Sequence, residues 1–201
     1  MKRILVILCI SVVALSSCSS IARMVFGIEE LKQFDSKRVD SFLTESQKNI
    51  NCTQIIATKE QVDSIIRLDF DSIMMQHRAQ PVQVLYFAGD SLVFYHINCY
   101  TQSGFMSFDW NNYGSFDSFP PTPDIVEDIH SSMSLDKYRS VFPELGIETK
   151  YTIIILWSNM LQKVSRKAVE TVANNIKGRS DCMVTFINTD KWWVDYFNKN
   201  Q

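Results

Sequence analysis

The spacing of apolar residues in the first third of the chain is that of helices. Apolar side chains recur at roughly helical intervals from 29 to 43 and more regularly from 58 to 80. Thr58 and Gln61 have the spacing of a capping box at the start of the second helix, and Pro81 ends it. We therefore expect a helical region over residues 28–80.

The pattern then changes to runs rich in β-branched and aromatic residues. Residues 82–88 and 91–100 form two such runs, and the Gly89-Asp90 pair between them is typical of a two-residue hairpin turn. Residues 105–110 predict a third strand of the same antiparallel sheet, so that region 81–114 is a hairpin or meander.

Prolines and capping residues divide the segment that follows. Three prolines between 116 and 124 indicate a loop. Thr122 is placed to cap a short helix that starts at Pro123, and Ser134 to cap another that runs to Phe142.

The last third of the chain predicts a βαβ unit over residues 150–190. Two continuous apolar runs, 151–157 and 182–187, are typical of strands buried on both faces. Between them, residues 160–177 have helical periodicity, and Gly178 provides a stop. Such a unit forms a parallel pair with a right-handed crossover. The predicted fold class is α/β (α+β), in one globular domain from 28 to 201.

The first 17 residues have the pattern of a secretory signal. Lys2 and Arg3 precede an apolar stretch from 4 to 15, which is too short to span a bilayer. The stretch ends in Leu15-Ser16-Ser17-Cys18, which resembles the lipobox of bacterial lipoproteins. That resemblance implies cleavage before Cys18, acylation of Cys18, and a lipidated tether over residues 18–27.

The charge of the chain restricts its partners. The formal charge is −2, and loss of residues 1–17 would make it −4 by removing two basic residues and no acidic one. A nucleic-acid partner is not expected, because the basic surface that such proteins need is missing. The membrane would be bound through lipid. No acidic residue lies between Cys18 and Glu29, and Ser19 follows Cys18. We therefore expect a periplasm-facing protein on the cell membrane or outer membrane.

The βαβ unit resembles part of the membrane-anchored, TlpA-type thioredoxin-like proteins. Their strand enters its helix through a motif containing Trp and C-x-x-C, and here the aligned string is Leu156-Trp-Ser-Asn-Met-Leu-Gln-Lys-Val-Ser-Arg-Lys167. Trp157 matches the motif, and the next strand ends in Asp190 as the family's does. Leu161 and Val164 occupy the two redox positions, so the resemblance implies a copy without thiol–disulfide chemistry.

The chain departs from this family in a second way. The family's later hairpin follows a cis-proline, whereas no proline follows Pro143 here. Either the strands within 82–110 complete a degenerate or rearranged thioredoxin-like sheet in a different order, or the fold is not thioredoxin-like.

The side chains that carry chemistry are few. Cys52, Cys99 and Cys182 remain after the signal and lipid site, so at most one internal disulfide can form, and an atypical thiol protein is an alternative. The chain has three histidines without metal-ligand spacing, no glycine-rich phosphate loop and no nucleophile elbow. We predict no metal and no cofactor.

Aromatic residues between 94 and 119 are interleaved with amide and carboxylate side chains, an arrangement that can stack on sugars. A glycan-binding module is therefore a second alternative, although aromatic residues are common in strands. Its contacts would lie at a turn formed by Trp110, Asn111, Asn112 and Tyr113. The leading hypothesis is a non-catalytic binding or assembly module for another envelope protein, because no catalytic constellation is assembled in the sequence.

Overall fold

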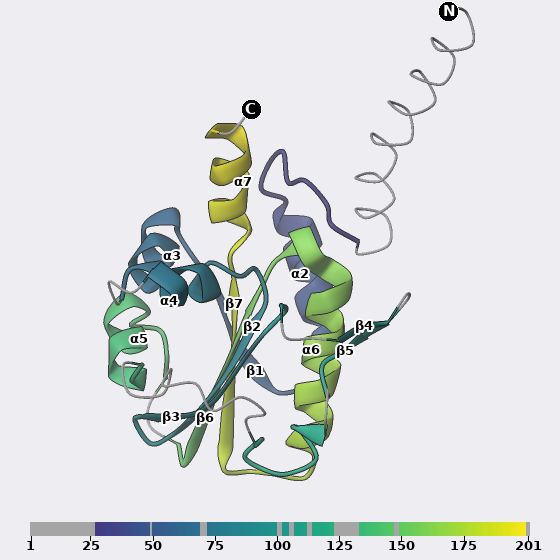
Figure 1. The fold of residues 1–201 in the computed structure, drawn as a ribbon, viewed down its shortest axis with the longest axis vertical. Helices are drawn as coiled ribbons and strands as arrows, with labels where there is room; N and C mark the ends of the chain where they lie inside the picture. Colours follow the sequence, from purple (N-terminus) through teal and green to yellow (C-terminus); the bar gives the residue numbers. More distant parts are fainter. Residues whose placement is uncertain are drawn as a thin grey trace, which may run out of the picture.

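The fold is a mixed five-stranded sheet with helices on both faces (Figure 1). It comes from a computed structural model that describes residues 27–48, 50–68, 72–99, 102–104, 107–111, 114–122, 133–146 and 149–199. The strand order is β1-β7-β6-β2-β3. The predicted α/β class is confirmed.

The βαβ unit forms as predicted. Strand β6 (Tyr151–Trp157) and strand β7 (Cys182–Asn188) are parallel, with Ile153 opposite Val184. A short 3₁₀ turn, η3 (Asn159–Leu161), leads into helix α6 (Gln162–Asn175) between them. Both strands are mostly apolar because each is buried under helices on both faces.

The predicted hairpin is also present and completes the sheet of the βαβ unit. Strands β2 (Gln83–Ala88) and β3 (Ser91–Ile97) are antiparallel, and β2 also pairs antiparallel with β6. Gly89 in the turn has a φ of +58°, in the left-handed region that glycine adopts without strain. The hairpin precedes β6 in the chain and joins its sheet. This arrangement is compatible with both alternatives that the sequence leaves open, a rearranged thioredoxin-like sheet and a different fold.

Two elements of the β structure differ from the prediction. Strand β1 (Cys52–Ile56), which the periodicity does not reveal, is a short edge strand parallel to β7. The expected third strand is present as β5 (Ser107–Asp109), but its predicted place in the same sheet is wrong, because it pairs with β4 (Gln102–Gly104) in a separate two-stranded sheet. The chain leaves the main sheet after β3, and Trp110 then packs in the core beside α6 instead of extending the sheet edge.

The first helix begins later than predicted. Helix α2 (Ser36–Ser46) starts at an Asp35 cap, whose carboxylate accepts a 3.1 Å hydrogen bond from the Arg38 amide. Residues 27–35 are not helical, because the Glu29 amide donates to the carbonyl of Met160 at 2.9 Å and Leu31 is buried. We call residues 27–35 the strap.

The second predicted helix is interrupted. Thr58 and Gln61 form the predicted capping box, but the helix divides into α3 (Lys59–Ile66) and α4 (Ser72–Arg78). The apolar residues on the two sides of the interruption keep nearly the same helical spacing. Helical spacing indicates which positions are buried, so it does not reveal a break of this kind.

Two shorter helices complete the described chain. Helix α5 (Leu135–Val141) is capped by Ser134 as predicted. The aromatic residues near the end of the chain lie on α7 (Asp190–Lys199), which continues upward from β7 in Figure 1.

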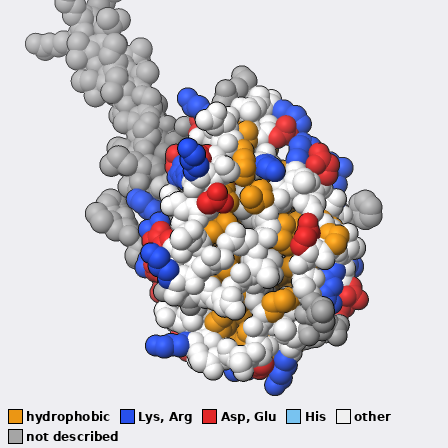
Figure 2. Space-filling view, turned by 180° about the vertical axis from the view of Figure 1, so that it is seen from behind, with side chains coloured by type: hydrophobic (Ala, Val, Ile, Leu, Met, Phe, Trp, Pro, Cys, Tyr) orange, Lys and Arg blue, Asp and Glu red, His pale blue; other side chains and the backbone are white. Residues whose placement is uncertain are grey.

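The sheet separates two apolar cores. Helices α2 and α6 cover one face, and α3 and α5 cover the other. On the side opposite to that of Figure 1, apolar side chains show as small separate areas, and most charged side chains lie toward the margin (Figure 2). Burial of apolar side chains in these two layers, one on each face of the sheet, therefore supplies the main favourable contribution to folding.

Some sequence predictions fall outside the described residues. These are the signal segment with Cys18, the helix expected after Thr122, His130, and the turn residues Asn112 and Tyr113.

Candidate functional site

Polar side chains gather where the two parallel strands of the βαβ unit end. Ser158 and Asn159 follow β6, and Asp190 follows β7 after one residue. Ligand sites in open α/β sheets lie outside the carboxyl ends of parallel strands, because those ends meet at one edge and present loop and helix-start groups there. This is also the edge where the resemblance to redox proteins places the missing thiols.

Asp190 is the centre of a buried hydrogen-bond network. Its carboxylate is 3% exposed and accepts from Ser158 Oγ at 2.7 Å, the Asn159 amide at 2.8 Å and Asn159 Nδ2 at 2.6 Å. Ser158 Oγ in turn accepts from the Met160 amide at 3.0 Å, which caps η3. The network joins the ends of β6 and β7 and fixes the side chains at this edge.

One acceptor in this network lacks a partner. Asn159 is 1% exposed, and its Oδ1 accepts no hydrogen bond from any described residue. The Asp190 carboxylate accepts three hydrogen bonds at the start of α7, and it interacts electrostatically with Arg38. Buried acceptors and buried charges are costly unless they are paired.

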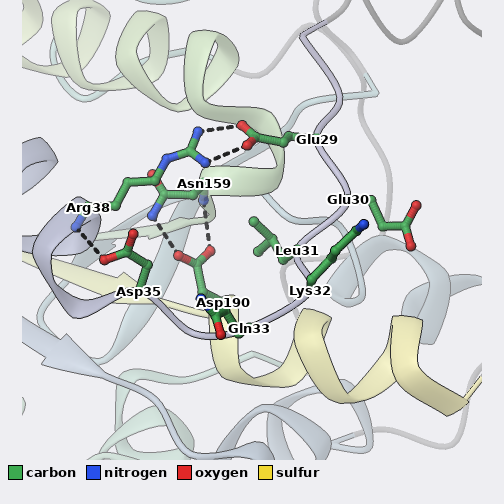
Figure 3. Close-up of a pocket in the computed structure, with 9 residues that line it drawn as sticks. All are labelled: Glu29, Glu30, Leu31, Lys32, Gln33, Asp35, Arg38, Asn159 and Asp190. Carbon is green, nitrogen blue, oxygen red and sulfur yellow. Dashed lines mark hydrogen bonds and ion pairs between the residues drawn. The ribbon is translucent and has the colours of Figure 1, made fainter.

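The strap makes a pocket of about 320 Å³ over this network (Figure 3). Its backbone is held by the bond from Glu29 to Met160, and Leu31 anchors it in the core. The residues that line the pocket come from the strap, α2 and the two strand ends: Glu29, Glu30, Leu31, Lys32, Gln33, Asp35, Arg38, Asn159 and Asp190.

Arg38 forms one wall of the pocket and is held by the strap. Its guanidinium forms a two-pronged ion pair with Glu29, with Nη1 2.7 Å from Oε1, and Nη2 also donates to Gln162 Oε1 at 3.1 Å. The hydrogen bonds with Arg38 lower the pKa of Glu29, and the same bonds raise the pKa of Arg38. Both groups stay charged at neutral pH. Glu29 and Gln162 together engage three of the five N–H donors of Arg38.

The charges around the pocket favour a cation. Four carboxylates line it, and only Lys32 and Arg38 are basic, so the lining has two more negative than positive groups. No group of three or more His, Cys, Asp and Glu side chains within the described ranges could hold a metal ion together.

Leu161 and Val164, at the positions of the redox thiols in the resemblance, are core residues. Both are buried in the apolar cluster between the sheet and helices α2 and α6. Trp157 is also fully buried there, and its ring stacks on Phe42 of α2 at a centroid distance of 4.0 Å. This edge therefore presents carboxylate and amide groups instead of sulfur.

The three described cysteines are free and lie apart from the pocket. Burial raises the pKa of all three thiols, and that of Cys52 rises to about 11. A reactive thiol needs the opposite shift, toward a thiolate at neutral pH.

Cys52 should therefore react slowly with alkylating agents. With every other cysteine changed to serine, we expect its rate at neutral pH to be about 100-fold below that of an exposed thiol, and to rise about tenfold per pH unit up to about pH 10. Stopped-flow maleimide labelling across pH measures this. A rate that levels off below about pH 8.5 would contradict the raised pKa.

The predicted glycan-contact turn is only partly described. Trp110 is 1% exposed, lies in the core and packs against His96 at 5.1 Å between ring centroids. Asn111 Nδ2 donates a hydrogen bond to Asp117, and Asn111 Oδ1 accepts one from the Phe116 amide. The Asn111 side chain is therefore engaged by neighbouring residues of its own segment. The structure therefore places Trp110 away from the surface and away from the strap pocket.

The sequence did not single out the residues that line the pocket. Arg38, Asn159 and Asp190 are far apart in the chain, and only the parallel pairing of β6 and β7 brings the last two together. One signal was present: Ser158-Asn159 and Thr189-Asp190 each follow a continuous apolar strand, where site residues of α/β proteins stand.

The chain matches no protein-family model, no curated protein and no solved structure. Fold and site together define an α/β protein with a charged pocket at the carboxyl ends of its parallel strands. Within the described ranges, none of the helices has both the length and the apolarity that a bilayer crossing requires.

Proposed function

We propose that the protein is a lipid-anchored, periplasm-facing module that binds another envelope protein at the strap pocket and performs no chemistry of its own. The observation that carries the proposal is the pocket itself. It stands at the sheet edge where α/β proteins hold ligands, and charged and amide side chains from the strap, α2 and the two strand ends line it.

The position of the strap supports a link between the anchor and the pocket. The strap begins at Gly27, nine residues after Cys18. Nine residues span at most about 30 Å when fully extended. If Cys18 carries lipid, the pocket wall is the first described part of the chain after the anchor.

The pocket is lined mainly by carboxylate, amide and basic side chains, which suit polar recognition. Among the described residues that line it there is no cysteine, histidine or serine, and the thiols elsewhere have raised pKa values. The two alternatives have less support, because Trp110 is buried and burial raises the pKa of the three described thiols.

Cross-linking in intact cells tests the proposal, with recovery through a C-terminal tag and mass spectrometry. We expect one envelope protein in stoichiometric amount. Changing Gln33 at the pocket rim to Trp should abolish its recovery, and the same change at Lys177, beyond the far end of α6, should not. In parallel, Cys18→Ser should release the chain into the soluble periplasmic fraction.

Recovery of the chain alone, across several cross-linker lengths, would contradict the binding proposal. An unmodified Cys18 in the mass spectrum of the mature chain would contradict the anchor, independently of the partner.

A further inference from the structure

The two margins of the five-stranded sheet differ in how they are covered. Strand β3, at one margin, is buried along nearly its whole length, has a register shift against β2 and meets Ser134 at an isolated bridge. Strand β1, at the other margin, exposes Thr53, Gln54 and Ile56 and keeps a regular register with β7. An exposed edge strand offers its unpaired N–H and C=O groups to a further strand.

The pairing of β1 with β7 shows which of its backbone groups point outward. The Ala57 amide, just after β1, donates to the carbonyl of Asn188 in β7 at 3.0 Å. Backbone groups alternate in direction along a strand, so those of Cys52, Gln54 and Ile56 point away from β7. Among the described residues, none forms a hydrogen bond with these outward backbone groups.

Strand β1 also lacks the features that protect exposed edges. Natural edge strands are protected by charged side chains, prolines or bulges that prevent further pairing. No charged residue and no proline lies between Lys48 and Lys59, and the register with β7 is free of bulges. Ile56 is 38% exposed, which is high for a large apolar side chain. This edge is therefore open to another strand, which would also cover Ile56.

We propose that β1 pairs antiparallel with β1 of a second copy of this chain, across a two-fold axis at Gln54. In this register Gln54 lies opposite Gln54 of the second copy, and Ile56 lies opposite Cys52 of the second copy. The outward backbone groups then form about six hydrogen bonds, because each opposed pair exchanges two. Two-fold pairing uses both free edges, so the assembly closes as a dimer. The inference is independent of the strap pocket and of the lipid anchor.

Charge favours a second copy as the occupant of this edge. The chain has a net negative charge, so two copies repel where their acidic side chains meet. Pairing about Gln54 brings together only uncharged side chains of β1. Beyond the strand, the antiparallel arrangement brings the exposed Lys48 of one copy toward the exposed Glu60 of the other. Lys59 is already paired with Asp63 in its own helix, so it does not compete for Glu60.

The size of the contact sets its strength. Five residues on each side bury less than the roughly 1,200 Å² at the low end of stable interfaces. We therefore expect a reversible dimer with a Kd on the order of 10 μM. Sedimentation velocity of the whole mature chain measures this, in non-ionic detergent with micelles in large excess over protein.

Substitution of Gln54 places the contact at the two-fold axis. Gln54→Lys and Gln54→Glu each put like charges directly opposite one another, and each should raise the Kd at least tenfold. An equal mixture of the two variants puts opposite charges across the axis and should restore association to within about threefold of wild type. This restoration also shows that both variants are folded.

Ser91→Lys is the matched control. Ser91 is the exposed first residue of β3, the strand at the opposite margin of the sheet, and its change should leave the Kd unaltered. A chain that stays monomeric up to about 1 mM would overturn the proposal and leave the edge to a strand of a different protein. A dimer that is insensitive to Gln54→Lys, or that the mixture fails to restore, would overturn the assignment of β1 as the contact.

Discussion

Asp190→Ala should lower the free energy of unfolding by about 3 kcal/mol, because it leaves three buried donors without an acceptor. Those donors are Ser158 Oγ and the backbone and side-chain amides of Asn159, which join the ends of β6 and β7. Urea denaturation followed by circular dichroism measures the loss. The pocket floor depends on this network, so its energy also measures how firmly the site is held.

The matched control is Glu170→Ala. Glu170 is a half-exposed carboxylate that pairs with Lys167 on the surface of α6, and its loss should change the free energy of unfolding by less than about 0.5 kcal/mol. If the two variants were equally stable, the network at Asp190 would contribute no more than a surface ion pair, and the description of the pocket floor would be wrong.

Phe42→Ala should have an effect of similar or larger size, a loss of about 3–4 kcal/mol in the free energy of unfolding. Phe42 is almost fully buried and stacks on Trp157 with an interplanar angle of 17°. The stack attaches α2 to the end of β6, and α2 carries Arg38, to which the strap is ion-paired. Hydrogen exchange should therefore accelerate in residues 36–46 before it accelerates in β6.

Tyr196→Ala provides the comparison for this variant. Tyr196 is an aromatic residue of α7 with 45% of its surface exposed, and its truncation should cost less than about 1 kcal/mol. A Phe42 variant that kept wild-type stability and wild-type exchange in α2 would show that the helix is held without the stack.

The sequence predicts the strands that carry a local signal better than the strand that does not. Strands β6 and β7 are continuous apolar runs, and the turn at Gly89 specifies the β2–β3 hairpin, so local signals suffice for these elements. Strand β1 is a short edge strand with exposed side chains, and it gains stability only from pairing with β7. Local periodicity does not report such a tertiary contribution.

The candidate site shows the same division. Burial of Leu161 and Val164 follows from their helical spacing and is confirmed. The strap was predicted as the start of a helix because it contains Leu31 and Phe34 at helical spacing, but its bonds go to Met160 and Arg38. The pocket is made from the strap and two strand ends, which are segments more than 100 residues apart in the chain. It could therefore be found only once the structure showed that these segments are in contact.

The strap closes over the buried network and is held there by Glu29. If Cys18 carries lipid, a partner that contacts the strap would do so at a segment that begins nine residues after the anchor. We propose that the partner binds at this edge of the sheet.

The measurement that tests this claim most directly is site-specific photo-cross-linking in intact cells. A photoreactive amino acid would replace Gln33 at the pocket rim in one strain and Lys177, beyond the opposite end of α6, in another. We predict that a discrete cross-linked envelope protein forms from position 33 and not from position 177. Cross-links from position 177 alone, or the same products from both positions, would contradict the assignment of the strap pocket as the binding site.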